Sequence, residues 1–143
     1  MRITTDPAAI QFDDVHGFLS RDAYWCKGVP AATLRKAIAH SLCFSALDAE
    51  GAQVGFARVV TDRATYAYLC DVFVLPQARG SGVSKALMDA VIAHPDLQGL
   101  RRFALATADA HALYARYGFA PLGDASRFME IYRPGVYAGA AGS

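Results

Sequence analysis

Apolar and polar residues recur along this chain with two periods, one typical of β-strands and one typical of helices. Apolar runs over residues 53–61 and 65–75, joined by the short polar turn TDRA, predict two neighbouring strands. Val83, Leu87 and Val91 recur every four residues, which predicts a helix with one apolar stripe. The pattern therefore predicts a strand pair followed by an amphipathic helix at the centre of the chain.

The rest of the chain adds helices and strands on both sides of this centre. Further helices are predicted over residues 10–19, 32–40 and 110–117, and further strands over 2–5, 42–47, 101–107 and 128–133. Asp109 can cap the last helix, and Gly118 can end it with Phe119 as an apolar partner. The order β-α-α-β-β-β-α-β-α-β predicts an α+β (mixed α/β) fold, in which helices cover a mixed sheet.

Length and composition indicate one domain with a substantial core. The chain has 143 residues, of which 54% are hydrophobic and 19% are charged. We expect a folded domain over residues 1–135 and a flexible tail over 136–143. The net charge is +1, and no apolar run approaches the ~20 residues of a membrane span. We therefore expect neither nucleic acid nor a membrane as a partner.

The cysteines and histidines lack the spacing of metal or redox motifs. Cys26, Cys43 and Cys70 form no CxxC pair and have apolar neighbours, which predicts buried reduced thiols and a cytoplasmic location. The four histidines lie far apart in the sequence, so no metal site is expected.

A turn with two glycines, RGSGVSK, separates the second central strand from the helix. Such turns offer backbone N–H groups to phosphates, although a plain turn with surface cations is the alternative. The spacing is neither that of a P-loop, GxxxxGK[ST], nor that of a GxGxxG turn. The pattern that fits is R-x-x-G-x-G/A, with Arg79 and Gly82 in place and Ser84 at the last position.

This pattern resembles the pyrophosphate-binding motif of the GNAT superfamily of acetyl-CoA-dependent N-acetyltransferases. The stretch LYARYGFAPL, residues 113–122, resembles the second recognisable segment of that family. The resemblance covers about residues 42–122. It implies a GNAT-like fold, with a central mixed, mostly antiparallel sheet flanked by about four helices, and acetyl-CoA as cosubstrate with no metal.

The resemblance also implies which residues bind acetyl-CoA. Gly80 and Gly82 would let the backbone approach the pyrophosphate, while Arg79 and Lys85 would add positive charge. Residues 72–74 correspond to a strand segment that pairs with pantetheine and polarises the thioester carbonyl. The implied binding residues are Val72, Phe73, Val74, Arg79, Gly80, Ser81, Gly82, Val83, Ser84 and Lys85.

Three residues are candidates for acid–base chemistry. By resemblance, Tyr114 is the general acid that protonates the departing thiolate. His111 lies three residues earlier on the same helix face, where it can help deprotonate the amine or be a plain surface histidine. Asp71 is the only charge in an apolar strand, so it either meets the acceptor amine or is held by structural hydrogen bonds. The general base is left open between His111 and Asp71.

The surroundings of Asp71 carry further expectations. A simple hairpin register places Arg58 about four residues away along the strand, roughly 13 Å at ~3.3 Å per residue. Strand alternation places the Cys70 side chain on the opposite face, in the core. In the loop DAYWCKG, Tyr24 and Trp25 either line the acceptor pocket together with Asp71 or simply cover the core.

These observations predict an N-acetyltransferase that moves an acetyl group from acetyl-CoA to a primary amine of a small molecule, by direct attack in a ternary complex. The alternatives are a non-catalytic acetyl-CoA-binding regulatory module and a transferase acting on a protein or peptide amine, and a longer acyl chain is also open. We expect a monomer or a homodimer, since an edge strand such as FMEIYR can pair between subunits.

Overall fold

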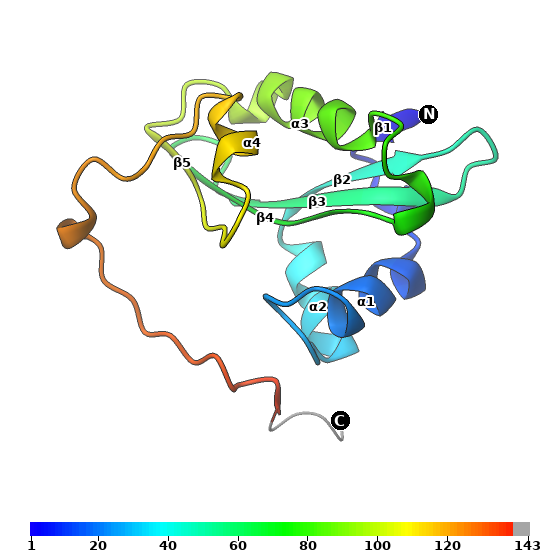
Figure 1. Ribbon diagram of the computed structural model, residues 1–143, viewed down its shortest axis with the longest axis horizontal. Helices are drawn as coiled ribbons and strands as arrows, with labels where there is room; N and C mark the ends of the chain where they lie inside the picture. The colour runs from blue at the N-terminus through cyan, green and yellow to red at the C-terminus, as the bar shows by residue number, and fades with distance from the viewer. Residues whose placement is uncertain (139–143) are drawn as a thin grey trace.

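A five-stranded sheet forms the centre of the computed structural model, which describes residues 1–138 (Figure 1). The strands follow one another across the sheet in sequence order, and only the last pairing, between β4 and β5, is parallel. Their bounds are β1 Arg2–Thr4, β2 Leu42–Leu47, β3 Gln53–Thr61, β4 Tyr66–Val74 and β5 Arg102–Leu105. The predicted α+β class with a mostly antiparallel sheet is confirmed.

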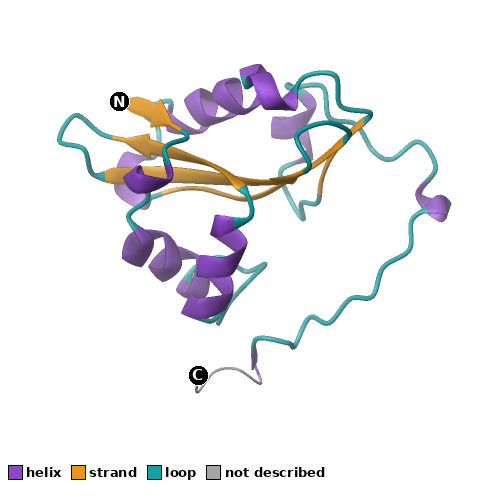
Figure 2. Ribbon diagram, turned by 180° about the vertical axis from the view of Figure 1, so that it is seen from behind, coloured by secondary structure: helices purple, strands orange, loops and turns teal. Residues whose placement is uncertain are grey.

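Helices cover both faces of this sheet (Figures 1 and 2). The helices α1 (Phe12–Arg21) and α2 (Ala31–Ala39) lie on one face, and α3 (Val83–Ala93) and α4 (His111–Ala115) lie on the other. The predicted stripe of α3 is buried against the sheet. The largest fully buried side chains on the α3 side are Phe44, Val59, Leu87, Met88 and Val91, and those on the α1 side are Val15, Leu19 and Phe56.

The connection between β3 and β4 is longer than the predicted turn TDRA. One carboxylate oxygen of Asp62 accepts hydrogen bonds from the backbone N–H groups of Ala64, Thr65 and Tyr66. Thr61 and Ala67 are the last residues that pair across the hairpin, so the connection between them is longer than the four-residue turn. This register brings Arg58 opposite Cys70, so the predicted distance of roughly 13 Å between Arg58 and Asp71 is wrong.

A β-bulge interrupts β4 at Asp71. The pairing with β3 shifts between Phe56 and Arg58, and Asp71 has a left-handed φ of 53°. Arg58 pairs with Cys70 and also binds the side chain of Asp71. Cys70 and Asp71 therefore face the same side of the sheet, and the predicted opposite orientation is wrong because the extra residue cancels the alternation.

The chain beyond α3 is packed less tightly than the chain before it. Within the described residues, no side chain after Leu97 is buried. β5 lies at the edge of the sheet, and α4 is a short helix that contributes no buried residue. No helix of residues 1–138 is long and apolar enough to cross a bilayer, and no group of three or more metal-binding side chains gathers there.

The predicted last strand over residues 128–133 is wrong. The described part of the chain has no strand after β5, and these residues lie on an extended arm that leaves the sheet (Figures 1 and 2). Strand composition predicts that a segment can pair, but pairing needs a neighbouring edge, and the arm runs away from its own sheet. Residues 139–143 of the predicted tail lie outside the described residues.

Candidate active site

The turn between β4 and α3 presents backbone N–H groups to solvent. Gly80 and Gly82 have φ angles of 83° and 84°, a left-handed conformation that side chains disfavour. Gly82 is the N-cap of α3 and brings no capping side chain, so the first N–H groups of the helix are left free. Across residues 1–138, no protein acceptor is bonded to the N–H groups of residues 80–85. This turn is therefore suited to binding an anion.

Two cationic side chains flank this turn. The Nε of Arg79 donates to the Val74 carbonyl at 3.1 Å, which ties the turn to the end of β4. The Nζ of Lys85 lies 2.8 Å from Asp89 Oδ2 in an exposed ion pair one turn along α3. Both cations thus lie beside the free N–H groups, where positive charge adds to the field of the helix N-terminus.

β4 and β5 pair over only part of their length. The last paired residues are Leu69 and Leu105, whereas β4 continues to Val74. Among residues 1–138, the backbone groups on this edge of β4 therefore have no strand partner beyond Leu69. Val72 packs toward the α3 side, while Phe73 is buried beneath α1. β4 thus continues beyond its pairing with β5, and the side chain of Phe73 belongs to the core.

Thr107 and Gly118 set the start and end of α4. The Thr107 hydroxyl accepts a hydrogen bond from the Ala110 N–H at 3.1 Å, whereas the predicted cap, Asp109, makes no capping bond. Gly118 adopts a φ of 96° after the helix, as its predicted role in ending the helix requires. The helix is thereby held close to the end of β5.

Tyr114 and His111 project from this short helix. The Tyr114 ring is half buried and packs edge-on against Phe119, with centroids 6.1 Å apart. Burial raises the pKa of Tyr114, and the charges of Tyr24 and Asp109 raise it further. Because the ordinary value for tyrosine is ~10, this phenol is protonated at neutral pH. His111 is exposed at the first position of α4.

Asp71 is buried, and both of its carboxylate oxygens accept hydrogen bonds. Oδ2 accepts from the Nε of Arg58 at 2.7 Å, and Oδ1 accepts from the Nε1 of Trp25 at 2.8 Å. The exposed fraction is 7% for the Asp71 side chain and 17% for that of Arg58. The carboxylate is thus neutralised by a buried cation and fixed in orientation by an indole.

The loop after α1 carries Trp25 and Tyr24, which contact two separate regions of the site. Trp25 binds Asp71, and the neighbouring Tyr24 packs edge-on against it, with centroids 5.1 Å apart. The Tyr24 hydroxyl accepts a hydrogen bond from the Ala108 N–H at 3.2 Å. The loop therefore links the side chain of Asp71 on β4 to the connection between β5 and α4.

The three thiols lie around the same ion pair. Burial raises the pKa of Cys26, Cys43 and Cys70 to about 12 in each case. All three are free, and at neutral pH they stay protonated, so they offer no thiolate nucleophile.

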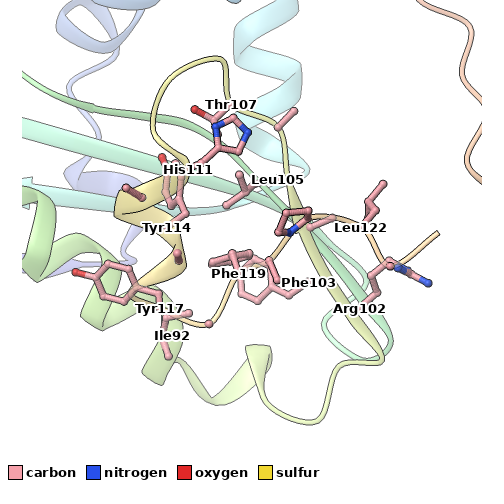
Figure 3. A pocket seen from close by; sticks show the side chains of 18 residues that line it. Ile92, Arg102, Phe103, Leu105, Thr107, His111, Tyr114, Tyr117, Phe119 and Leu122 are labelled. Carbon is pink, nitrogen blue, oxygen red and sulfur yellow. The ribbon is translucent and has the colours of Figure 1, made fainter. Parts of the chain in front are cut away.

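A groove of about 780 Å³ runs along the outer side of β5 and α4 (Figure 3). Tyr114 and His111 border it, together with Thr107. Asp71 and Trp25 do not, because the Asp71 side chain lies on the α1–α2 side of the sheet. The structure thus gathers the predicted site residues in three places: the α3 turn with the end of β4, the α4 groove, and the buried cluster around Asp71.

Sequence reasoning missed Arg58 as a residue of the site. The signal for it was present, because Arg58 is the only charge in β3 as Asp71 is in β4. Two lone opposite charges in neighbouring apolar strands favour a buried pair once the hairpin register is known.

Known proteins of several organisms resemble this chain. The family model described as an acetyltransferase (GNAT) domain matches residues 39–121. A candidate acetyltransferase of Gibberella zeae is 34% identical over an alignment of 135 positions, and the match covers 80% of this chain and 75% of that protein. The chloroplastic serotonin N-acetyltransferase 2 of Oryza sativa subsp. japonica is 36% identical over an alignment of 105 positions, and the match covers 70% of this chain and 52% of that protein. The crystal structure of a candidate GNAT acetyltransferase from Xanthomonas campestris pv. campestris is 57% identical, with a TM-score of 0.94 and 96% of each chain covered.

Proposed function

The chain belongs to the GNAT acetyltransferase family and is an acetyltransferase; from this premise we propose that it acetylates the primary amine of a small molecule, with acetyl-CoA as donor, by direct attack in a ternary complex. The observation that carries this proposal is the pair of open backbone edges: the free N–H groups of residues 80–85 and the unpaired side of β4 beyond Leu69. Both edges lie on one continuous stretch of chain.

The α3 turn is proposed to hold the pyrophosphate of acetyl-CoA. Its free N–H groups, the N-terminus of α3 and the charges of Arg79 and Lys85 all favour an anion there. Lys85 would exchange its exposed partner Asp89 for a phosphate, a change that costs little because exposed ion pairs are weak. Val83 and Ser84 follow Gly82 in the first turn and would contribute their N–H groups.

The open edge of β4 is proposed to hold the pantetheine arm. An extended chain that lies along residues 72–74 would pair with the backbone groups that β5 leaves free. When bound, acetyl-CoA supplies the thioester that the amine attacks. A β4 N–H would donate to the thioester oxygen as negative charge develops on it.

Tyr114 is proposed to return a proton to the leaving thiolate. Its raised pKa keeps the phenol protonated at neutral pH, which is the state that a general acid requires. A thiolate is a proton acceptor with an ordinary conjugate pKa of ~8.5, and a phenol hydrogen-bonded to its sulfur is able to donate a proton to it.

His111 is proposed to take the proton of the amine through a water molecule. It is exposed beside Tyr114, whereas both oxygens of Asp71 are bonded to Arg58 and Trp25. Asp71 is proposed as a positioning residue that holds the Trp25 loop in place. A neutral imidazole has a ring nitrogen that is able to accept a proton.

The acceptor is proposed to enter beside the Tyr24–Trp25 loop. These side chains are 58% and 43% exposed, and their rings offer apolar and cation–π contacts to an amine with an organic body. The rice relative is named as an acetyltransferase of serotonin, an alkylamine that carries an indole ring, so alkylamines with an aromatic ring belong in the first substrate panel.

The test is a calorimetric titration with acetyl-CoA and, separately, with ATP, followed by a thiol-release assay over a panel of small amines and short lysine peptides. Acetyl-CoA should bind and ATP should not, and a small amine should be acetylated faster than any peptide. Failure of acetyl-CoA to bind contradicts the assignment of the α3 turn. Binding without turnover on any amine would instead favour a regulatory acetyl-CoA-binding module.

A further inference from the structure

The arm over residues 123–138 exposes side chains that a strand normally buries. Met129, Ile131 and Tyr132 are 96%, 83% and 72% exposed. These residues belong to FMEIYR, whose strand-forming composition is the reason that the sequence predicts a strand there. A contiguous exposed apolar run on a folded protein marks a surface that binds something.

The groove beside β5 has the form of a place for one more strand. Its two walls are unbroken runs, residues 102–107 and residues 118–123. Successive side chains of a strand point to opposite faces, so a groove on one face would be lined by every second residue. Because consecutive residues line this groove, it opens along the backbone edge of β5. That edge has no partner strand within residues 1–138. The large apolar side chains that line the groove include Phe103, Leu105, Phe119 and Leu122 (Figure 3).

The arm of the same chain does not occupy this groove. Near its start, the Phe128 ring contacts Arg102, with the guanidinium carbon 4.7 Å from the ring centroid. Near its end, Tyr137 is half buried against Gly28 and lines a small cavity beside α2. Between these two contacts the arm runs outside the body of the protein (Figures 1 and 2). While Tyr137 holds this position, the strand-forming segment stays outside its own groove.

A solved structure supports this path of the arm. The match to the Xanthomonas campestris protein covers 96% of both chains with a TM-score of 0.94, and this share of the present chain includes most of the arm. Two related chains that both extend the same segment away from their own sheet are expected when a second copy receives it.

We propose that two copies of this chain exchange their arms, so that residues 128–133 of each copy add as a strand to β5 of the other. The exchange is symmetric, because each copy gives one strand and receives one. The added strand satisfies the open edge of β5 and buries apolar side chains of the arm against those of the groove. His111 and Tyr114 border the same groove, so the partner's arm completes the wall beside them. The proposal concerns assembly, and its test does not depend on the proposed reaction.

The first test is sedimentation velocity on the full chain over a range of concentrations. The wild type should be a dimer, and Ile131→Lys should raise its dissociation constant by roughly thirtyfold or more, as for a central interface residue. Val60→Lys is the matched control, because Val60 is also an exposed apolar residue (42%) but lies on β3, and this variant should remain a dimer. A monomeric wild type, or a dimer that Ile131→Lys leaves intact, overturns the proposal.

The second test separates exchange from closure of each arm on its own groove. Two single variants, Met129→Cys and Ala104→Cys, are mixed and treated with a short thiol-specific crosslinker. Burial raises the pKa of Cys26, Cys43 and Cys70, which slows the reaction of the native thiols relative to an exposed cysteine. A covalent heterodimer is expected, since one copy's arm must reach the other copy's β5. A second sample carries both cysteines in one chain. Absence of the heterodimer, or a crosslink that forms only within one chain of this double variant, overturns the exchange.

Discussion

The chain up to Leu97 and the chain after it are built in different ways. All buried side chains of the described residues lie in the first part, between the sheet and α1, α2 and α3. The second part has an edge strand, one short helix and an extended arm. The first part carries the α3 turn and the open edge of β4, and the second carries Tyr114 and His111. A finished core thus presents the proposed acetyl-CoA site, while the proposed proton donor comes from a part whose packing is incomplete.

The largest expected effect is on stability and compares one phenylalanine from each part. Phe44 is 1% exposed, so Phe44→Ala should lower the free energy of unfolding by about 3–5 kcal/mol. Phe119 is only half buried, and Phe119→Ala should cost about 1 kcal/mol by the same reasoning. Urea unfolding of both variants at one low protein concentration measures the difference. Equal losses of unfolding free energy would mean that the second part is as well packed in solution as the first. Insertion of residues 128–133 beside β5 would have that effect.

The next effect concerns the buried ion pair in the first part. Asp71→Ala leaves the largely buried charge of Arg58 without its carboxylate and with the Ser41 hydroxyl as its remaining side-chain partner, which should lower the free energy of unfolding by about 3 kcal/mol. Asp71→Asn keeps a residue type that tolerates the left-handed φ and should lose less. Asp89→Ala is the control, because its pair with Lys85 is exposed and its loss should leave the urea midpoint unchanged. A harmless Asp71→Ala would contradict the role given to this pair.

The first part was also the part that the sequence predicted well. The strands Leu42–Leu47 and Gln53–Thr61 have the predicted bounds, because buried apolar runs between polar turns leave few alternatives. The stripe of α3 is equally unambiguous. The contact between Trp25 and Asp71 joins residues 46 positions apart, and the bulge at Asp71 changes which face each side chain takes. Neither depends on local periodicity, so neither was predictable from the pattern.

The failure at residues 128–133 has a different cause. Alternation and composition report how a segment behaves when it is paired, and they contain no information on which edge it meets. The conformation of the α3 turn was predictable because glycines that adopt positive φ before a helix are a local feature. The role of Thr107 was missed because Asp109 is the commoner capping type, yet the Thr107 hydroxyl is the acceptor.

A third prediction separates binding from chemistry between the two parts. Tyr114→Phe removes the proposed proton donor and should lower kcat about a hundredfold, while the Kd for acetyl-CoA changes less than twofold. The control is Tyr66→Phe, an exposed tyrosine on β4 that should keep full activity. Single-turnover thiol release and calorimetry measure the two quantities. An unchanged kcat in Tyr114→Phe would assign the proton transfer to another group.

The pKa of Tyr114 fixes the pH range in which this comparison holds. Burial raises that pKa above the ordinary value of ~10, so the active, protonated form persists as pH rises and is lost only above that value. Between pH 7 and about 9, ionisation of Tyr114 should therefore cause no decline in the wild-type kcat. Any decline that occurs in this range should persist in Tyr114→Phe. A fall in this range that disappears in Tyr114→Phe would mean that the phenol ionises at a lower pH than its burial implies.

The smallest expected effect tests whether the conformation of one glycine serves binding as well as stability. Gly82 and Gly51 have φ angles of 84° and 82°, and a Cβ at either position would meet nothing within 4 Å. Alanine at each position should therefore cost about the same stability, roughly 1 kcal/mol, because the left-handed conformation is the only difficulty. Only Gly82→Ala should also weaken acetyl-CoA, by about fivefold, since it shifts the first N–H groups of α3 whereas Gly51 lies in the β2–β3 turn. Calorimetry on the pair decides the matter: if both variants bind as the wild type does, the anion site does not depend on the N-terminus of α3, and the first part of the chain loses its proposed role.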